Sequence, residues 1–124
     1  MYEPVLEFTR RLVQTPSLSR EEGELAERVV AEMLRLGYDE AYVDAVGNAV
    51  GRIRGREEGP GWLLLTHLDH VDVGDEANWP HPPFSGHVDA AGRLWGRGAV
   101  DIKGPLAATV YGAAAARAAG PPPR

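Results

Sequence analysis

The sequence predicts a small α/β domain in which helices cover a short β-sheet. Two segments, 4–14 and 25–34, carry apolar residues at helical spacing, and a third, 104–119, is rich in alanine. A Gly-Asn pair between two short runs is typical of a hairpin turn. The uninterrupted apolar run 62–66 is typical of a strand that is buried on both faces.

The first predicted helix covers residues 4–14 and ends at Thr15, because a residue that precedes proline disfavours the helical conformation. Ser19 and Glu22 then form a Ser-x-x-Glu capping box for the second helix. Apolar residues at positions 25, 26, 29, 30, 33 and 34 mark its buried face, and Gly37 is a natural stop.

Two short strands, 38–44 and 49–54, are expected on either side of the Gly-Asn turn. The apolar strand 62–66 needs neighbouring strands and a helix layer on each face. The chain supplies few strands, so one sheet edge should stay open. Residues 74–93 are predicted to form a loop, and residues 94–95 a very short strand before the last helix.

Composition narrows the class of protein. The 124 residues are 44% hydrophobic, which suffices for one core, so residues 1–124 are expected to form a single domain with a tail at 120–124. The net charge of -5 argues against nucleic-acid and anionic-membrane partners. No apolar run approaches the ~20 residues of a membrane span, and no leader-like segment opens the chain, so a cytoplasmic location is expected. Cysteine is absent, so a metal site would have to use His, Asp and Glu.

The first chemical signal directly follows the predicted buried strand. All four histidines lie between His67 and His87, and His67 stands two positions before Asp69. In α/β proteins, functional groups collect at the carboxyl ends of strands. Imidazole is a common metal ligand, and a neighbouring carboxylate commonly fixes its tautomer. The alternative interpretation is an ordinary polar loop.

The second signal is a glycine-rich stretch, residues 96–104, which presents Asp101 just before a predicted helix. A carboxylate held there can bridge two cations. The alternative is a simple helix N-cap, which needs no metal.

Taken together, the runs "LLLTHLDHVDVG", "WPHPPFSG" and "GRLWGRGAVDIKGPLAA" resemble one family. It is the family of metal-dependent amidohydrolases that includes acetylornithine deacetylase, succinyl-diaminopimelate desuccinylase, glutamate carboxypeptidase and aminoacylase. With "VGNAVGRIRG" and the two helices, the resemblance covers nearly the whole chain. It implies the three-layer α/β/α catalytic domain of a zinc exopeptidase-like fold, incomplete after the helix that follows Asp101.

The resemblance also implies roles for individual residues. His67 corresponds to a ligand of one zinc ion, Asp69 to the catalytic carboxylate that orients its imidazole, and Asp101 to the ligand that bridges two zinc ions, with cobalt as a possible substitute. The implied reaction is hydrolysis of an N-acyl amino acid or peptide amide bond by zinc-bound hydroxide. The family also implies a cis peptide between Asp101 and Ile102.

Other polar residues in this region receive structural interpretations. His70 and Asp72 are expected to be solvated loop groups, and His81 and His87 surface residues. Lys103 is expected to order the loop rather than take part in the chemistry.

The sequence departs from the family after Asp101, where it contains no Asp, Glu or His. Family members continue with a Glu-Glu pair, a further acidic ligand and a late His. A catalytic zinc usually has three protein ligands, whereas His67 and Asp101 would have to serve two ions. We therefore expect weak or absent zinc binding and a fragment that is inactive alone.

Two further expectations follow from this departure. The first is assembly, either as a homo-oligomer or with a second chain that supplies the missing half. The second is an alternative function, a non-catalytic metal-binding or protein-interaction module that keeps the fold. The origin of the fragment, as a truncated gene product or half of a split enzyme, stays open, as does the substrate.

Overall fold

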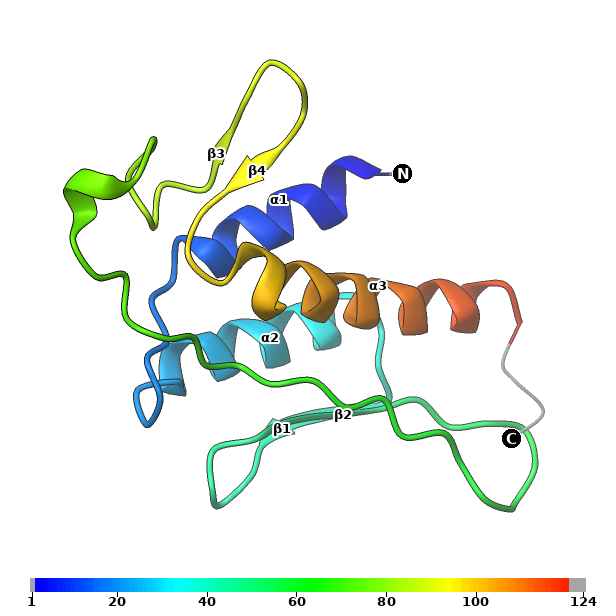
Figure 1. The fold of residues 1–124 in the computed structure, drawn as a ribbon. Coiled ribbons are helices and arrows are strands. Elements are labelled where there is room, and N and C mark those ends of the chain that lie inside the picture. The colour runs from blue at the N-terminus through cyan, green and yellow to red at the C-terminus, as the bar shows by residue number, and fades with distance from the viewer. Residues whose placement is uncertain (1, 121–124) are drawn as a thin grey trace.

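The computed structural model describes residues 2–120 and forms three long helices with two small antiparallel sheets. Figure 1 shows the three helices packed together, with the first hairpin beneath them. The predicted tail falls mostly on residues 121–124, which lie outside the described residues. In chain order the elements are α1 (Tyr2–Val13), α2 (Gly23–Arg35), β1 (Glu40–Val43), β2 (Ala49–Arg52), a 3-10 turn (Glu76–Asn78), β3 (His87–Val88), β4 (Leu94–Trp95), a wide turn (Ala99–Lys103) and α3 (Gly104–Ala118).

The core lies where the three helices meet. The predicted apolar face of α2 is confirmed at five of its six positions, which are buried. The sixth, Leu34, is 53% exposed. α3 has little amphipathic character, and its small alanines allow close packing of helix on helix. The buried cluster consists of Phe8, Leu12, Leu25, Val29, Met33, Leu106, Ala107 and Val110.

The predicted capping box at the start of α2 is wrong. No side chain caps this helix, which begins at Gly23. The Glu22 carboxylate instead accepts the backbone N–H of Arg20, and the hydroxyl of Ser19 donates to Asp69, fifty positions away. A hydrogen bond to a charged carboxylate is stronger than one between neutral groups, which favours the distant partner over the local cap.

The predicted hairpin is confirmed, with shorter strands. β1 and β2 pair antiparallel from Glu40 opposite Arg52 to Val43 opposite Ala49. Between them, Asp44 accepts the backbone N–H groups of residues 46 and 48 and closes the turn. α2 lies directly on β2, since a Cβ atom at Gly51 would come within 2.5 Å of Met33 Sδ.

The apolar run 62–66 does not form the predicted buried strand. It is extended in Figure 1, but neither described sheet includes it. The side chains of Trp62, Leu63, Leu64 and Leu65 are 90%, 83%, 61% and 84% exposed. A strand is buried by its neighbours, and the described residues supply none, so the three-layer arrangement is not formed by this part of the chain. What residues 2–120 form is a small α/β domain.

The predicted loop 74–93 carries more structure than expected. It contains the 3-10 turn and also β3, which pairs with the predicted short strand, β4, through His87 opposite Trp95. Within residues 2–120, no helix is both long and apolar enough to traverse a bilayer.

Candidate functional site

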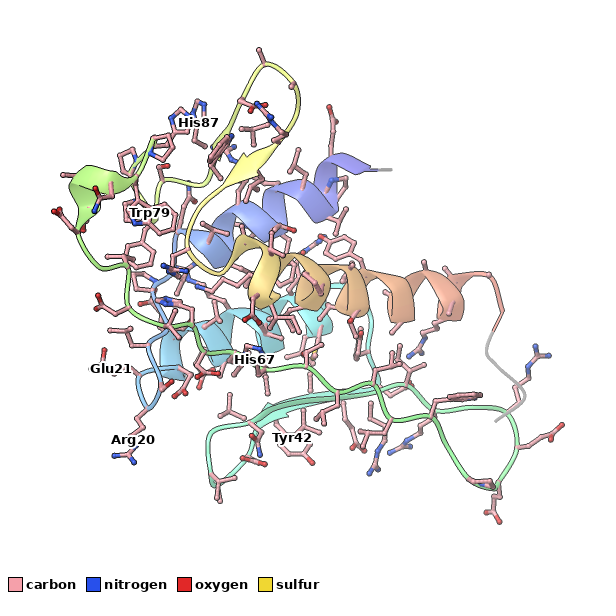
Figure 2. The ribbon with its side chains drawn as sticks, in the orientation of Figure 1. Arg20, Glu21, Tyr42, His67, Trp79 and His87 are labelled. Atoms are coloured by element: carbon pink, nitrogen blue, oxygen red, sulfur yellow. The ribbon has the colours of Figure 1, made fainter. Side chains whose placement is uncertain are left out.

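The extended segment that follows the apolar run meets the wide turn before α3, and there His67 faces Asp101. The Nε2 atom of His67 lies 3.0 Å from Oδ1 of Asp101. Figure 2 shows His67 on this extended segment. The two side chains, together with Asp69, line a cavity of about 230 Å³. The predicted convergence of these two residues is therefore present in the structure.

The other side of the His67 ring faces Asp69. The Nδ1 atom of His67 lies 3.1 Å from Oδ1 of Asp69 and 3.1 Å from its backbone carbonyl oxygen. Both atoms are acceptors, so they favour the tautomer whose proton is on Nδ1. In that tautomer the Nε2 lone pair points at the Asp101 carboxylate. A cation between Nε2 and the carboxylate would stabilise this arrangement of two electron-pair donors.

The Asp69 carboxylate has a second partner that the sequence did not reveal. The Ser19 hydroxyl donates to Oδ2 of Asp69 over 2.5 Å. This hydrogen bond, more than the nearby imidazole of His67, holds the pKa of the Asp69 carboxyl below its ordinary value. Asp69 therefore stays charged and is held at both of its oxygens. No local pattern signals the role of Ser19, because its partner is distant in sequence.

The turn that presents Asp101 depends on glycine. Gly98 has φ of +79°, which favours glycine, and its carbonyl accepts the backbone N–H of Lys103 over 2.7 Å. Gly96 packs against Val13 of α1, where a Cβ atom would overlap the valine side chain. The peptide between Asp101 and Ile102 is cis, as expected from the resemblance.

Lys103 orders the turn, as expected. Its side chain is only 1% exposed, and its ammonium donates to the carbonyl of Thr15 over 2.7 Å. Burial lowers the pKa of the Lys103 amine to about 8. The contact joins the turn before α3 to the end of α1.

His70 is not the solvated group that we expected. It is buried beneath the site, where its Nε2 accepts the backbone N–H of Ser17 over 2.9 Å and its Nδ1 lies 2.7 Å from the carbonyl of Val71. Both ring nitrogens are thus occupied in one neutral tautomer, which gives His70 a structural role. Asp72 is exposed, as expected, and accepts the backbone N–H of Gly74.

His81 and His87 lie away from this site. Their rings stack with centroids 3.9 Å apart, and the edge of Trp95 packs against His81. His87 is exposed, as expected of a surface residue, whereas His81 is half-buried. Figure 2 shows His87 beyond Trp79, on the opposite side of the molecule from the first hairpin.

His67 and Asp101 are residue types that commonly bind metal cations, but two ligands are too few for a complete metal site. An imidazole nitrogen and a carboxylate oxygen are typical zinc ligands, and they face each other here. Among residues 2–120, no three His, Cys, Asp or Glu side chains form a group that could hold a metal ion. A catalytic zinc usually takes three protein ligands, so His67 and Asp101 supply part of a coordination shell.

Comparison with protein families agrees with this geometry. A family model described as Peptidase family M20/M25/M40 matches residues 63–124, which is half of the chain. The match includes His67, Asp69 and Asp101, together with the turn that contains the cis peptide. The chain belongs to the peptidase family M20/M25/M40.

Proposed function

We propose that this chain carries part of the active site of a metal-dependent amidohydrolase that acts on N-acyl amino acids or peptides. The observation that supports the proposal most directly is the 3.0 Å approach of His67 Nε2 to Asp101 Oδ1 across 34 positions. A divalent cation such as Zn²⁺ or Co²⁺, when bound, acidifies water and polarises an amide carbonyl, which is the chemistry of amide hydrolysis.

The chain's own residues prepare this site. Asp69 keeps the proton of His67 on Nδ1 and leaves the Nε2 lone pair facing Asp101. Lys103 ties the turn that carries Asp101 to Thr15. His70 ties the segment that carries His67 to Ser17. The role we assign to Asp69 is therefore one of orientation, because its carboxylate contacts Nδ1 of the imidazole.

The site needs further groups before it can turn over substrate. Residues 102–124 contain no Asp, Glu or His, so they supply no general base. General-base catalysis alone is worth roughly 10² to 10⁴ in rate. We propose that the isolated chain does not hydrolyse amides and that another polypeptide contributes the base and the remaining ligands.

The exposed run 62–65 is the surface that we assign to this polypeptide. Its uninterrupted apolar character is typical of a strand flanked by parallel neighbours. A parallel neighbour would end at the same edge of the sheet as His67, so the residues that follow it would lie next to the site. The fitting partner is an apolar strand followed by carboxylate or imidazole groups, and the completed arrangement would be the three-layer α/β/α domain.

A second copy of this chain fits the same surface less well. Two copies related by a two-fold axis would pair their 62–65 runs antiparallel. The two His67 residues would then lie at opposite ends of the paired strands, and neither site would gain a ligand. Self-association would cover the apolar run without completing the site.

Assays of amide hydrolysis, with and without a second polypeptide, test this proposal. The chain, and an Asp101→Asn variant as its matched control, would be assayed with zinc or cobalt on N-acetyl amino acids and dipeptides. Each would be tested alone and with the polypeptide encoded by an adjoining reading frame that carries the missing acidic residues. We expect hydrolysis only from the mixture with wild type. Brisk turnover by the chain alone would contradict the proposal.

The alternative is a non-catalytic interaction module, which the exposed apolar run favours independently of the metal ligands. In that case light scattering would show the chain bound to its partner, or to a second copy, with no hydrolysis in any mixture. The same Asp101→Asn variant would then assemble like wild type.

A further inference from the structure

The loop between α1 and α2 contacts both segments of the site. From one side, the carbonyl of Thr15 accepts the buried ammonium of Lys103. From the other, Ser17 donates its hydroxyl to the carbonyl of Leu68 over 2.8 Å, and its backbone exchanges hydrogen bonds with His70. A short parallel bridge between Leu18 and His70 continues this pairing. The loop is therefore a scaffold for the segment that carries His67.

Ser19 differs from these backbone contacts, because it reaches a functional side chain. Its hydroxyl donates to Oδ2 of Asp69, while Oδ1 of the same carboxylate lies against Nδ1 of His67. The two oxygens of one carboxylate thus connect Ser19 to the imidazole. We propose that Ser19 is a positioning residue that, through Asp69, fixes the tautomer and orientation of His67. The proposal rests on the proposed function only for the role it gives to His67.

Exposure explains why Asp69 needs a second anchor. Its side chain is more than a third exposed, so water competes for both of its oxygens. Without Ser19, the carboxylate could rotate toward solvent, and the Nδ1 proton of His67 would keep only the backbone carbonyl of Asp69. The proton could then move to Nε2, which faces Asp101 and would no longer be free to donate its lone pair.

The backbone around Ser19 is consistent with this role. Arg20 has φ of +76°, a left-handed conformation that is uncommon for a residue with a side chain. Figure 2 shows Arg20 at the outer tip of the loop, directed away from the helices. This turn directs Ser19 to Asp69, and α2 begins without a side-chain cap.

Imidazole nitrogen NMR on the full chain tests the proposal. Spectra of ¹⁵N-labelled protein near pH 8.5, about two units above the ordinary histidine pKa, report which ring nitrogen of His67 carries the proton. We expect wild type to show well-separated Nδ1 and Nε2 shifts, with the proton on Nδ1. Ser19→Ala should move the two shifts toward each other, because the second tautomer becomes populated.

Matched variants separate positioning from folding. Ser19→Thr and Ser19→Val have nearly the same shape, and only the threonine keeps the hydroxyl, so only it should retain the wild-type shifts. Ser17→Ala removes a hydroxyl from the same loop without touching Asp69, and it should leave the His67 shifts in place. Amide spectra establish that each variant is folded. If Ser19→Ala unfolds, the difference in His67 shifts between Ser19→Thr and Ser19→Val tests the proposal instead.

The proposal is overturned if Ser19→Val gives the same His67 shifts as wild type, or if Ser17→Ala moves them as far as Ser19→Ala does. Neither cation nor substrate enters this measurement. Its outcome is therefore independent of whether the chain hydrolyses amides, so a failure of the proposed function would not be mistaken for a failure of this inference.

Discussion

Nε2 of His67 lies 3.0 Å from Oδ1 of Asp101, and both side chains are largely open to solvent, with exposures of 47% and 86%. A polar contact this exposed contributes at most about 1 kcal/mol to stability, even when both partners are charged. The approach of these two residues is therefore poorly explained as a device that holds the fold together. It is better explained as part of a site that binds something between them.

The first prediction concerns the cost of removing this pair. Asp101→Asn should change the free energy of unfolding by less than about 1 kcal/mol, because the carboxylate is exposed and makes no buried contact. Urea denaturation followed by circular dichroism measures this. A loss of several kcal/mol would show that Asp101 has a structural role that we have not recognised.

Lys103 should behave in the opposite way. Lys103→Ala removes a buried stem as well as the hydrogen bond to Thr15, and should destabilise the chain by about 2–5 kcal/mol, as other large-to-small core changes do. Lys103→Met keeps most of the stem and should cost clearly less. Denaturation of both variants side by side tests the difference, and equal losses would mean that packing of the stem is unimportant.

A third prediction concerns acid stability. Glu32 is only 4% exposed, and the hydrogen bond from Arg35, helped by Tyr111 and Arg11, lowers the pKa of its carboxyl below the ordinary 4.5. A lowered folded-state pKa gives stability that is present above pH 4.5 and lost as pH falls through the folded-state pKa.

Glu32→Gln should therefore be less stable than wild type at pH 7, and the gap should narrow as the pH falls below 4.5. Thermal unfolding between pH 7 and pH 3 measures this. Glu24→Gln is the control, since the pair of Glu24 with Arg28 is exposed on the same helix. A constant gap at every pH would remove Glu32 ionisation as the cause.

A fourth prediction compares two glycines. Gly51→Ala places a methyl group against Met33 and the Tyr38 ring, at 2.5 Å and 2.8 Å, and should cost about 1–3 kcal/mol. Gly112→Ala lies in α3 with open space around it, and should stabilise by about 0.5–1 kcal/mol. Melting temperatures that move in the same direction would contradict the packing of α2 on β2.

Features of the fold that depend on neighbouring residues could be predicted from the sequence, and features that depend on distant contacts could not. The helices and the hairpin could be predicted, because helical spacing and the Gly-Asn turn act within a few residues. The state of residues 62–66 could not, because burial of a strand depends on its neighbours. Ser19 is wrongly predicted as a helix cap, because a serine three positions before a glutamate is typical of a capping box. Its actual partner, Asp69, lies fifty positions away.

The candidate site shows the same division. That His67 and Asp101 converge was expected from the family resemblance together with the rule that functional groups gather at strand ends. That His70 is buried and tied to Ser17 was not, because a polar residue beside a site looks solvated until the loop that covers it is known.

Titration calorimetry with zinc tests the central claim most directly. We predict weak binding of one zinc ion by wild type, loss of that binding in His67→Ala and in Asp101→Ala, and no change in His87→Ala, which alters a histidine away from the site. Zinc binding by His67→Ala with the affinity of wild type would contradict the claim that His67 and Asp101 together form a cation site.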